Sequence, residues 1–417
     1  MNEWKEVSLS EMGKTITGKT PSSQHPEDFG DEMPFITPSD SFEKKYINKS
    51  DRFLSRSGSD RLKEKIISPN SIMVTCIGSA MGKVAKNSLS SVTNQQINSI
   101  IVNENFDSDY IYYLLKNNYA VLRNAASGST AIPILNKTDF DNLRFKVELN
   151  LNEQRKMVSI LSTIDDKIET NNQINEELEA MAKTLYEYWF VQFDFPDENG
   201  KPYKSSGGKM VYNDQLKREI PEGWGVDSLW NIATFYNGLA MQKFRPASET
   251  DESLPVIKIR EMFSGFSKDT EKASTAIPKE AIIEAGDILF SWSATLEVIL
   301  WGGEKGALNQ HIFKVTSEKY PKSFIYNELR SYLKVFKTIA ELRKTTMGHI
   351  TQDHLKQAMI IVPPNDLIDE IHNRISPILK QQLDLKQQNQ ELTQLRDWLL
   401  PMLMNGQVRV EDKTWKL

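Results

Sequence analysis

The sequence predicts an α+β fold, in which two similar mixed α/β domains are joined by two long antiparallel coiled-coil helices as a pseudo-twofold internal repeat. Three observations lead to this prediction: the length of 417 residues, a self-match between the two halves, and an apolar seam at the same place in each half. At roughly 100–200 residues per domain, the length corresponds to two or three domains. Apolar residues make up 39% and charged residues 26%, a composition typical of globular proteins.

The same composition indicates a cytoplasmic protein. No stretch approaches the roughly 18 uncharged apolar residues of a membrane-spanning helix. Glu3, Lys5 and Glu6 leave no room for the apolar region of a secretory signal. Cys76 is the only cysteine, so an internal disulfide or a cysteine-based zinc site is excluded. The net charge of −5 argues against a nucleic-acid binder, although a neutral domain can bind DNA when its basic groups share one face.

The two halves of the chain match each other in order. Residues 1–190 align with residues 221–404, and the offset drifts from 220 to 214, as small loop insertions and deletions produce. The matched segments include Trp4 and Gly18 with Trp224 and Gly238, Asn94-Gln95-Gln96-Ile97 with Asn309-Gln310-His311-Ile312, and Asn175-Glu176-Glu177-Leu178 with Asn389-Gln390-Glu391-Leu392. Few positions are identical, so we expect the halves to share a fold but not their contact residues.

Each half begins with a globular domain and continues into a long helix. Short apolar runs such as Ser71–Ile77 and Ile282–Trp292 predict the strands of these domains. We expect Val362-Pro363-Pro364-Asn365 to mark the start of the second long helix. The predicted organisation is a first domain at 1–150, a helix at 151–191, a polar linker at 192–221, a second domain at 222–362, a helix at 363–405 and a tail at 406–417.

Both long segments carry a coiled-coil seam, in which apolar residues recur at steps of four and three. The seam residues are Ile164, Ile168, Asn171, Asn175, Leu178, Ala182, Leu185 and Trp189 in the first helix, and Ile378, Gln382, Leu385, Asn389, Leu392, Arg396, Leu399 and Leu403 in the second. Neither helix is apolar enough to be stable alone. We therefore expect them to pair with each other; the alternative is two unrelated amphipathic helices, each on its own domain.

An aromatic cluster ends the first helix. It comprises Tyr186, Tyr188, Trp189, Phe190, Phe193 and Phe195. Six aromatic side chains in ten residues require a packing partner. We expect this partner to be the second domain, with a contact to another protein as the alternative.

Basic side chains gather in acid-poor stretches of both domains. No acidic residue lies between Asp109 and Asp139. These stretches yield the candidate phosphate contacts Lys116, Arg123, Lys137, Lys337, Arg343 and Lys344. Such groups can bind a nucleic-acid backbone, and the alternative is an ordinary solvated helix face.

Several motifs suggest catalysis but lack the surrounding residues that it requires. The segment from Gly13 to Thr20 matches the phosphate-binding pattern G-x4-G-K-T, which needs a helix directly after it. Pro21 and Pro26 follow instead. His349 and His354 are five residues apart and share no helix face, so no metal site is predicted. We expect Cys76 to be buried and inert, and we expect no catalytic site or cofactor in this chain.

The central helix contains three conspicuous segments: Asn152-Glu153-Gln154-Arg155-Lys156, the run from Ile160 to Ile168 and the run from Glu177 to Phe190. Ile220-Pro221-Glu222-Gly223-Trp224 follows before the second domain. The three segments resemble the central conserved helix of type I restriction–modification specificity (S) subunits, and the fourth resembles the usual opening of their recognition domain. Gly18-Lys19-Thr20-Pro21-Ser22 resembles the family's G-x-T-P-S turn, and Gly128-Ser129-Thr130 resembles its loop before the last strand of the domain. The second half departs from these motifs, with Gly238-Leu239-Ala240-Met241 and Gly348-His349-Ile350.

The resemblance implies two target recognition domains, each reading one half of a bipartite double-stranded DNA sequence for a host-defence system. It implies that the paired helices dock two methyltransferase (M) subunits, which carry S-adenosylmethionine, while restriction (R) subunits carry ATP and magnesium. The motifs add Lys19, Ser129, Thr130 and His349 to the candidate DNA contacts. The alternatives are a nucleotide-binding enzyme with a phosphate loop, and a coiled-coil scaffold that does not bind DNA.

Overall fold

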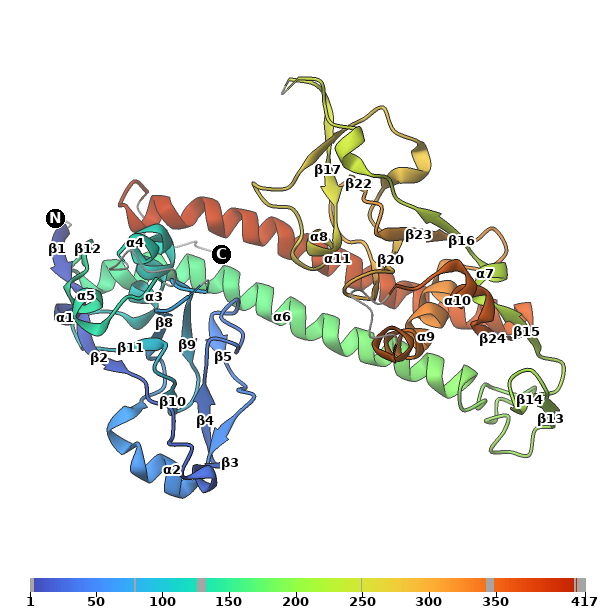
Figure 1. Cartoon of the computed structure of the whole chain (residues 1–417), viewed down its shortest axis with the longest axis horizontal. Coiled ribbons are helices and arrows are strands. Elements are labelled where there is room, and N and C mark those ends of the chain that lie inside the picture. The colour runs from blue at the N-terminus through green and yellow to red at the C-terminus, as the bar shows by residue number, and fades with distance from the viewer. Residues whose placement is uncertain are drawn as a thin grey trace, which may run out of the picture. The chain divides into compact units, whose positions relative to one another are not determined.

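A computed structural model describes residues 4–78, 80–125, 133–248, 250–342, 349–408 and 410. The chain forms two compact units (Figure 1). Unit 1 comprises Met1–Ile168 and Leu392–Leu417, and unit 2 comprises Glu169–Glu391. Two 40-residue helices, α6 (Leu151–Phe190) and α11 (Asn365–Met404), run through both units. Each unit therefore contains one globular domain together with a part of each long helix.

The domain of unit 1 consists of short strands and short helices. Its strands are β1 (Trp4–Ser8), β2 (Gly13–Thr17), β3 (Phe29–Gly30), β4 (Met33–Ile36), β5 (Tyr46–Ile47), β6 (Phe53–Leu54), β7 (Ile66–Ile67), β8 (Ile72–Thr75), β9 (Val84–Asn87), β10 (Ser91–Thr93), β11 (Ile97–Val102) and β12 (Arg144–Glu148). Its helices are α1 (Leu9–Met12), η1 (Pro26–Asp28), α2 (Arg56–Arg61), η2 (Lys63–Lys65), α3 (Ser108–Asn117), α4 (Tyr119–Asn124) and α5 (Lys137–Asn142).

The domain of unit 2 has the same kinds of element. Its strands are β13 (Met210–Asn213), β14 (Arg218–Pro221), β15 (Gly225–Ser228), β16 (Thr234–Asn237), β17 (Ser253–Ile257), β18 (Lys272–Ser274), β19 (Ile282–Ile283), β20 (Ile288–Ser291), β21 (Glu297–Leu300), β22 (Gly306–Leu308), β23 (Ile312–Thr316) and β24 (Met359–Val362). Its helices besides α6 and α11 are α7 (Leu229–Ile232), η3 (Met241–Lys243), α8 (Ile259–Ser264), η4 (Lys279–Ala281), α9 (Lys322–Leu342) and α10 (Gln352–Gln357).

The sheet topology confirms the internal repeat. The order β2-β11-β8-β9 in unit 1 corresponds to β16-β23-β20-β21 in unit 2, and both sheets are antiparallel across these strands. The pair β1–β12 corresponds to β15–β24. A parallel pair also recurs, with Val92 opposite Phe35 in unit 1 and Val256 opposite Ala307 in unit 2. The repeated register shows that the two domains share one backbone frame.

Two predicted segments differ from what the structure shows. The run Ile282–Trp292 forms two strands, β19 and β20, because the chain turns at Gly286, whose φ of +87° suits glycine. Residues 192–221, predicted as a polar linker, contain the antiparallel hairpin β13–β14. Phe195 stacks on Tyr203 at 4.6 Å between ring centroids, so this segment is held by its aromatic side chains.

The long helices begin where the chain supplies caps. The Asn150 side chain accepts a hydrogen bond from the backbone N–H of Asn152 at 2.9 Å, at the start of α6. Pro363 and Pro364 directly precede α11, as expected, and the Pro364 carbonyl accepts the N–H of Ile368. A proline suits this position because helix-starting N–H groups have no partner within the helix.

The seam residues are buried or half-buried throughout, and the helices pair in antiparallel fashion within each unit. In unit 2, the Asn171 amide donates to Asn389 Oδ1 at 2.8 Å, and Gln382 donates to the Asn175 carbonyl at 3.2 Å. In unit 1, Arg396 of α11 forms an ion pair with Asp165 of α6 at 2.8 Å. The polar seam positions therefore bond across the pair, which fixes its register.

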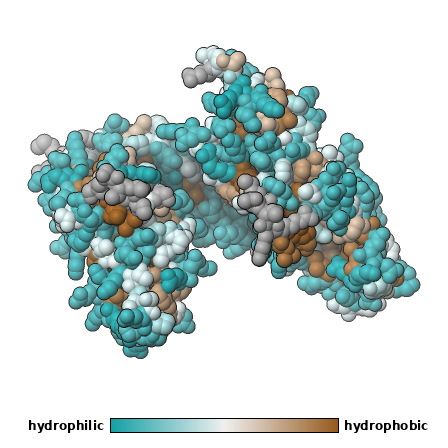
Figure 2. All heavy atoms as spheres, viewed as in Figure 1, coloured by the Kyte–Doolittle hydropathy of each residue, from teal (hydrophilic) through white to brown (hydrophobic). Residues whose placement is uncertain are grey.

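Each domain packs its core onto a different part of the helix pair. In unit 1, Leu400 and Leu403 at the end of α11 join the core of the domain. The backbone of Gly406 lies against the indole of Trp4 at the start of β1. In unit 2, Trp189 and Phe190 at the end of α6 join a core that contains Trp224. This confirms that most of the aromatic cluster packs within unit 2, although Tyr188 is exposed. Apolar side chains are mostly interior, and hydrophilic residues dominate the described surface in Figure 2.

Candidate nucleic-acid interface

Backbone hydrogen bonds hold the turn after β2 against the turn before β11. The N–H of Gly18 donates to the Ile97 carbonyl at 3.1 Å, and the N–H of Lys19 donates to the Thr93 carbonyl at 2.9 Å. The Thr20 hydroxyl donates to Gln95 Oε1 at 2.6 Å. A Cβ on Gly18 would lie 2.1 Å from the Asn94 carbonyl oxygen, so only glycine fits at this approach.

The loop between β8 and β9 joins the same place. The N–H of Cys76 donates to the Gln96 carbonyl at 2.8 Å, and the Cys76 carbonyl accepts the N–H of Leu135 at 2.9 Å. The N–H of Gly78 donates to the Pro133 carbonyl. We call the segments 18–22, 76–78, 80–83, 94–96 and 133–135 loop face 1. Ser129 and Thr130 lie outside the described residues, and the chain that follows them returns to loop face 1.

Unit 2 assembles the equivalent segments in the same way. The N–H of Gly238 donates to the Ile312 carbonyl, and a Cβ there would lie 2.2 Å from the Asn309 carbonyl oxygen. The N–H of Trp292 donates to the His311 carbonyl, and the Trp292 carbonyl accepts the N–H of Ile350 at 2.9 Å. We call the segments 237–241, 292–296, 309–311 and 349–350 loop face 2. His349 lies on it, with its ring centroid 5.5 Å from that of Trp292.

Three of the predicted basic contacts lie on or beside these faces. Lys19 is exposed on loop face 1. Arg123 lies over the ring of Tyr119, and this ring packs against Gly82. Lys337 pairs with Glu297 of β21 at 3.1 Å, beside loop face 2. Arg123 and Lys337 are separated by the repeat offset of 214, so they occupy equivalent positions.

The structure gives the other basic candidates different surroundings. Lys137 is exposed and forms an ion pair with Asp141 one helical turn away. Arg343 and Lys344 lie outside the described residues. Lys116 is half-buried, and its ammonium group donates to the Tyr112 hydroxyl at 3.2 Å. Burial lowers the pKa of Lys116, and the nearby positive charge of Arg396 lowers it further. This position beside the helix pair indicates a structural role for Lys116 rather than a phosphate contact.

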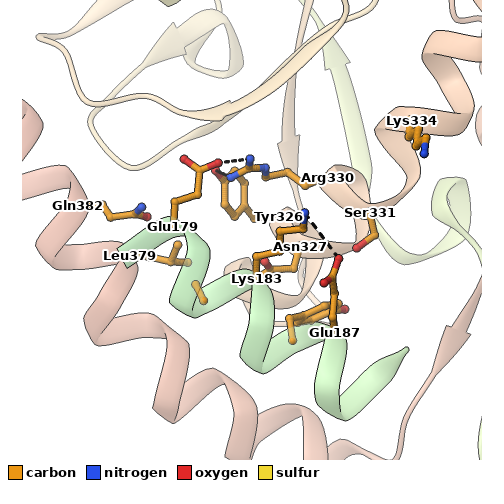
Figure 3. Close-up of a pocket in the computed structure, with 12 residues that line it drawn as sticks. Glu179, Lys183, Glu187, Tyr326, Asn327, Arg330, Ser331, Lys334, Leu379 and Gln382 are labelled. Atoms are coloured by element: carbon orange, nitrogen blue, oxygen red, sulfur yellow. Dashed lines mark hydrogen bonds and ion pairs between the residues drawn. The ribbon is translucent and has the colours of Figure 1, made fainter. Parts of the chain in front are cut away.

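Unit 2 contains a pocket of about 240 Å³ between α6, α9 and α11 (Figure 3). Ala182, Tyr186 and Leu379 line its apolar part, and an ion pair between Glu179 and Arg330 lines its charged part. At the repeat offset of 214, the positions of Ala182 and Leu379 correspond to those of Arg396 and Asp165 in unit 1.

The segment that matches a phosphate-binding loop has a different local structure. Residues Gly13–Thr17 form β2, which pairs with β11, and the next helical turn is the short η1 at Pro26–Asp28. The nucleotide-binding alternative is therefore wrong for this segment. Cys76 is buried, and burial raises its thiol pKa to about 12, so it is a poor nucleophile. In the described part of the chain, no group of His, Cys, Asp or Glu is arranged to hold a metal ion.

Sequence reasoning missed several polar side chains on the two faces. Gln95 and Asn237 are exposed, and Gln310 and Trp292 are half-buried. The signal that could have found them is the repeat itself, since Asn94-Gln95-Gln96 aligns with Asn309-Gln310-His311. Both turns follow a strand that pairs in parallel with its neighbour, β10 in unit 1 and β22 in unit 2.

Two domains with one backbone frame and different side chains on equivalent faces define a duplicated recognition protein. Residues 1–180 and 221–394 each match the model of the type I restriction modification DNA specificity domain. The chain therefore belongs to this family, as its central helix implied, and membership argues against the scaffold alternative. No helix in the described part of the chain is both long and apolar enough to cross a membrane.

Relatives support the assignment along the whole chain. The MjaIX specificity subunit of Methanocaldococcus jannaschii is 27% identical over 98% of this chain and 94% of its own length. The HindI specificity subunit of Haemophilus influenzae is 36% identical over 44% of this chain and 40% of its own length. The crystal structure of the S subunit from M. genitalium has the same fold, with a TM-score of 0.58, 16% identity, and coverage of 97% of this chain and 96% of that one.

Proposed function

We propose that this chain selects the DNA sequence for a type I restriction–modification complex, with loop face 1 and loop face 2 each contacting one half of a bipartite target. The observation that supports this most directly is that both domains gather the same segments into one face, while the side chains on the two faces differ. A shared frame with divergent contact residues suits two readers of different sequences.

The two faces carry the groups that DNA recognition uses. Lys19 and Arg123 in unit 1 and Lys337 in unit 2 can neutralise phosphates, which supplies affinity without sequence preference. Gln95, Asn237 and Gln310 carry amides, which can form hydrogen bonds to base edges. Phosphate contacts position a protein on the duplex, and base contacts specify the sequence. Each domain has both kinds of group on or beside its loop face.

The chain acts without catalysis of its own. Methyl transfer and S-adenosylmethionine belong to methyltransferase subunits, and ATP, magnesium and cleavage belong to restriction subunits. The buried Cys76 and the strand at Gly13–Thr17 support this division, because neither provides a reactive group or a nucleotide site.

The helix pair docks two methyltransferase subunits, one in each unit. In unit 1, α11 exposes Leu395 and Trp398, which are 44% and 59% exposed. In unit 2, α6 exposes Met181 and Tyr188, which are 60% and 36% exposed. Met181 and Leu395 are separated by the repeat offset of 214, and helical geometry places all four residues on the same flank of the seam. Equivalent apolar patches suit two copies of one partner.

Methylation mapping tests the DNA proposal. DNA exposed to this chain together with its methyltransferase partner is sequenced for methylated bases, which reveals both half-sites and the spacer between them. Replacing residues 222–362 by the equivalent domain of another specificity subunit should change one half-site only. The reciprocal exchange of residues 1–150 should change the other half-site. If either exchange altered both half-sites, the two-reader proposal would be wrong.

The mass of the assembled complex tests the docking proposal. Met181→Glu and Trp398→Glu should each lower the number of bound methyltransferase subunits from two to one, and the double variant should bind none. Leu342→Glu is the matched control, because Leu342 is 78% exposed but lies on α9. Two bound subunits in the double variant would place the docking surface elsewhere.

A further inference from the structure

The indole of Trp292 lies at the centre of loop face 2 and contacts the side chains of Asn237, His311 and His349. Trp292 is half-buried, and its ring lies 5.6 Å from that of His311 and 5.5 Å from that of His349. Its backbone bonds to His311 and Ile350, so three loop segments meet at this residue. Its indole N–H donates to Asn237 Oδ1 at 2.9 Å.

This hydrogen bond determines what Asn237 offers to a ligand. An indole N–H can only donate, so the atom of Asn237 that faces it must be the carbonyl oxygen. The amide NH₂ then points away from the indole, and Asn237 is exposed. Histidine always carries at least one N–H, and both His311 and His349 are exposed beside the same indole. The described part of loop face 2 therefore presents several donors in a fixed arrangement.

Unit 1 has no such arrangement at the equivalent positions. Thr17 occupies the position of Asn237, and its hydroxyl donates to Asn98 at 2.7 Å. The buried Cys76 occupies the position of Trp292, because it makes the same backbone hydrogen bonds, and Ile134 occupies the position of His349. Ile134 is 43% exposed, so loop face 1 has an aliphatic surface where loop face 2 has donors.

We propose that Asn237, held by Trp292 and flanked by His311 and His349, reads a guanine in the half-site of the second domain. Guanine presents two acceptors, N7 and O6, in the major groove, whereas adenine presents one acceptor and one donor. An amide held in this orientation suits guanine, because its NH₂ group faces outward as a donor while its oxygen is turned toward the indole N–H and away from the position needed to accept from the adenine amino group. Trp292 is a positioning residue in this arrangement. The inference rests on the proposed function of loop face 2.

The test is methylation mapping with the full chain and its methyltransferase partner. Trp292→Phe removes the indole N–H and leaves the Asn237 amide able to turn. One guanine position of the second half-site should then accept adenine as well, while the first half-site stays unchanged. Asn237→Ala, at an exposed position, should slow methylation of the guanine-containing site about 5- to 100-fold and remove the base preference at that position. Trp230→Phe is the matched control in the same domain, and both half-sites should be unchanged.

The outcomes separate the inference from the proposed function. A wild-type complex that methylates no bipartite sequence would refute the proposed function. A wild-type complex that does so, with Asn237→Ala leaving every base preference of the second half-site intact, would overturn the inference alone. Loss of a preference in the first half-site would assign Asn237 to the wrong half and overturn the inference as well. Because Asn237→Ala replaces an exposed side chain, its result decides the question even if Trp292→Phe does not fold.

Discussion

The two domains meet the helix pair at equivalent positions but with different side chains. In unit 1, Arg396 pairs with Asp165, and the Tyr113 hydroxyl donates to the same carboxylate at 2.6 Å. In unit 2, the positions of Arg396 and Asp165 are held by Ala182 and Leu379, and a pocket of about 240 Å³ lies there. An ion pair of unit 2, between Glu179 and Arg330, lies at the pocket wall and is more exposed than the pair of Arg396 and Asp165.

Beside this difference, the two units share one side-chain arrangement. A basic residue and a tyrosine one turn before it recur in both units, as Lys116 with Tyr112 and as Arg330 with Tyr326. The neighbouring positions on the helix pair have changed from the ion pair of Arg396 and Asp165 to Ala182 and Leu379, and in unit 2 Arg330 itself pairs with Glu179. The two domains keep the same strand pairing, so side chains can diverge, even at the seam positions Ala182 and Arg396, without changing the fold.

Removing one partner of each ion pair should show the largest contrast between the units. Arg396→Ala leaves Asp165, whose side chain is 8% exposed, without its cation, and should lower the free energy of unfolding by about 3–5 kcal/mol. Arg330→Ala is the matched change in unit 2. Its side chain and that of Glu179 are 31% and 48% exposed, so the loss should stay below about 1 kcal/mol. Urea unfolding of both variants measures the contrast, and equal losses would contradict it.

The two units should also differ in how the pH affects their stability, because one pair of equivalent positions holds a titrating residue only in unit 2. Burial raises the pKa of the Glu328 carboxyl, which accepts a hydrogen bond from the Tyr186 hydroxyl, to about 7. The equivalent residue of unit 1 is Leu114. The folded protein therefore keeps a proton that the unfolded chain loses from about pH 4.5 upward. As pH rises from about 4.5 to about 7, stability should fall by on the order of 3 kcal/mol.

Glu328→Gln tests this assignment, because an amide does not titrate. The variant should lose this part of the pH dependence and should be more stable than the wild type at pH 8. Unfolding midpoints at pH 5 and pH 8 measure the effect. Leu114→Gln in unit 1 is the control for the cost of an amide at this position. An unchanged pH dependence in Glu328→Gln would assign the titration to another group.

Phosphate contacts should give the smallest effects. Arg123→Ala and Lys337→Ala should each weaken binding to every DNA sequence and reduce the slope of log affinity against log salt by about one. Lys116→Ala should leave this slope unchanged, because its ammonium group faces Tyr112. Titrations of the complex with DNA at several salt concentrations measure the slopes. A reduced slope for Lys116→Ala would return this residue to the DNA interface.

The helix pair was predictable from local periodicity, and the repeat was predictable from the match between segments that lie 214 to 220 residues apart. Seam spacing places residues such as Ile164 and Leu403 on one face of a helix wherever the helix packs. The domain faces depend on contacts between distant segments, such as Thr20 with Gln95, which spacing along the chain does not encode. The number of charged residues in a segment also does not reveal the direction of a side chain, so the contact of Lys116 with Tyr112 could not be predicted.

The hairpin after α6 is a second feature that the sequence did not predict. Glycines and serines at 199–208 are typical of linkers, and the turns at Gly200 and Gly207 do have positive φ. What orders the segment is the packing of Phe193 and Phe195 on Trp224, which lies about 30 residues away. Turn chemistry predicts where the chain bends, but not whether the bend packs against a core.

The contact between Gly406 and Trp4 brings the end of α11 to the start of β1. A circularly permuted chain could therefore join these two points through a short connection and open at the turn 214–217 between β13 and β14. The strand pairs within each unit would be retained, apart from the connection between β13 and β14. The order in which the two domains follow each other along the polypeptide is thus a matter of connectivity, and the folded units do not depend on it.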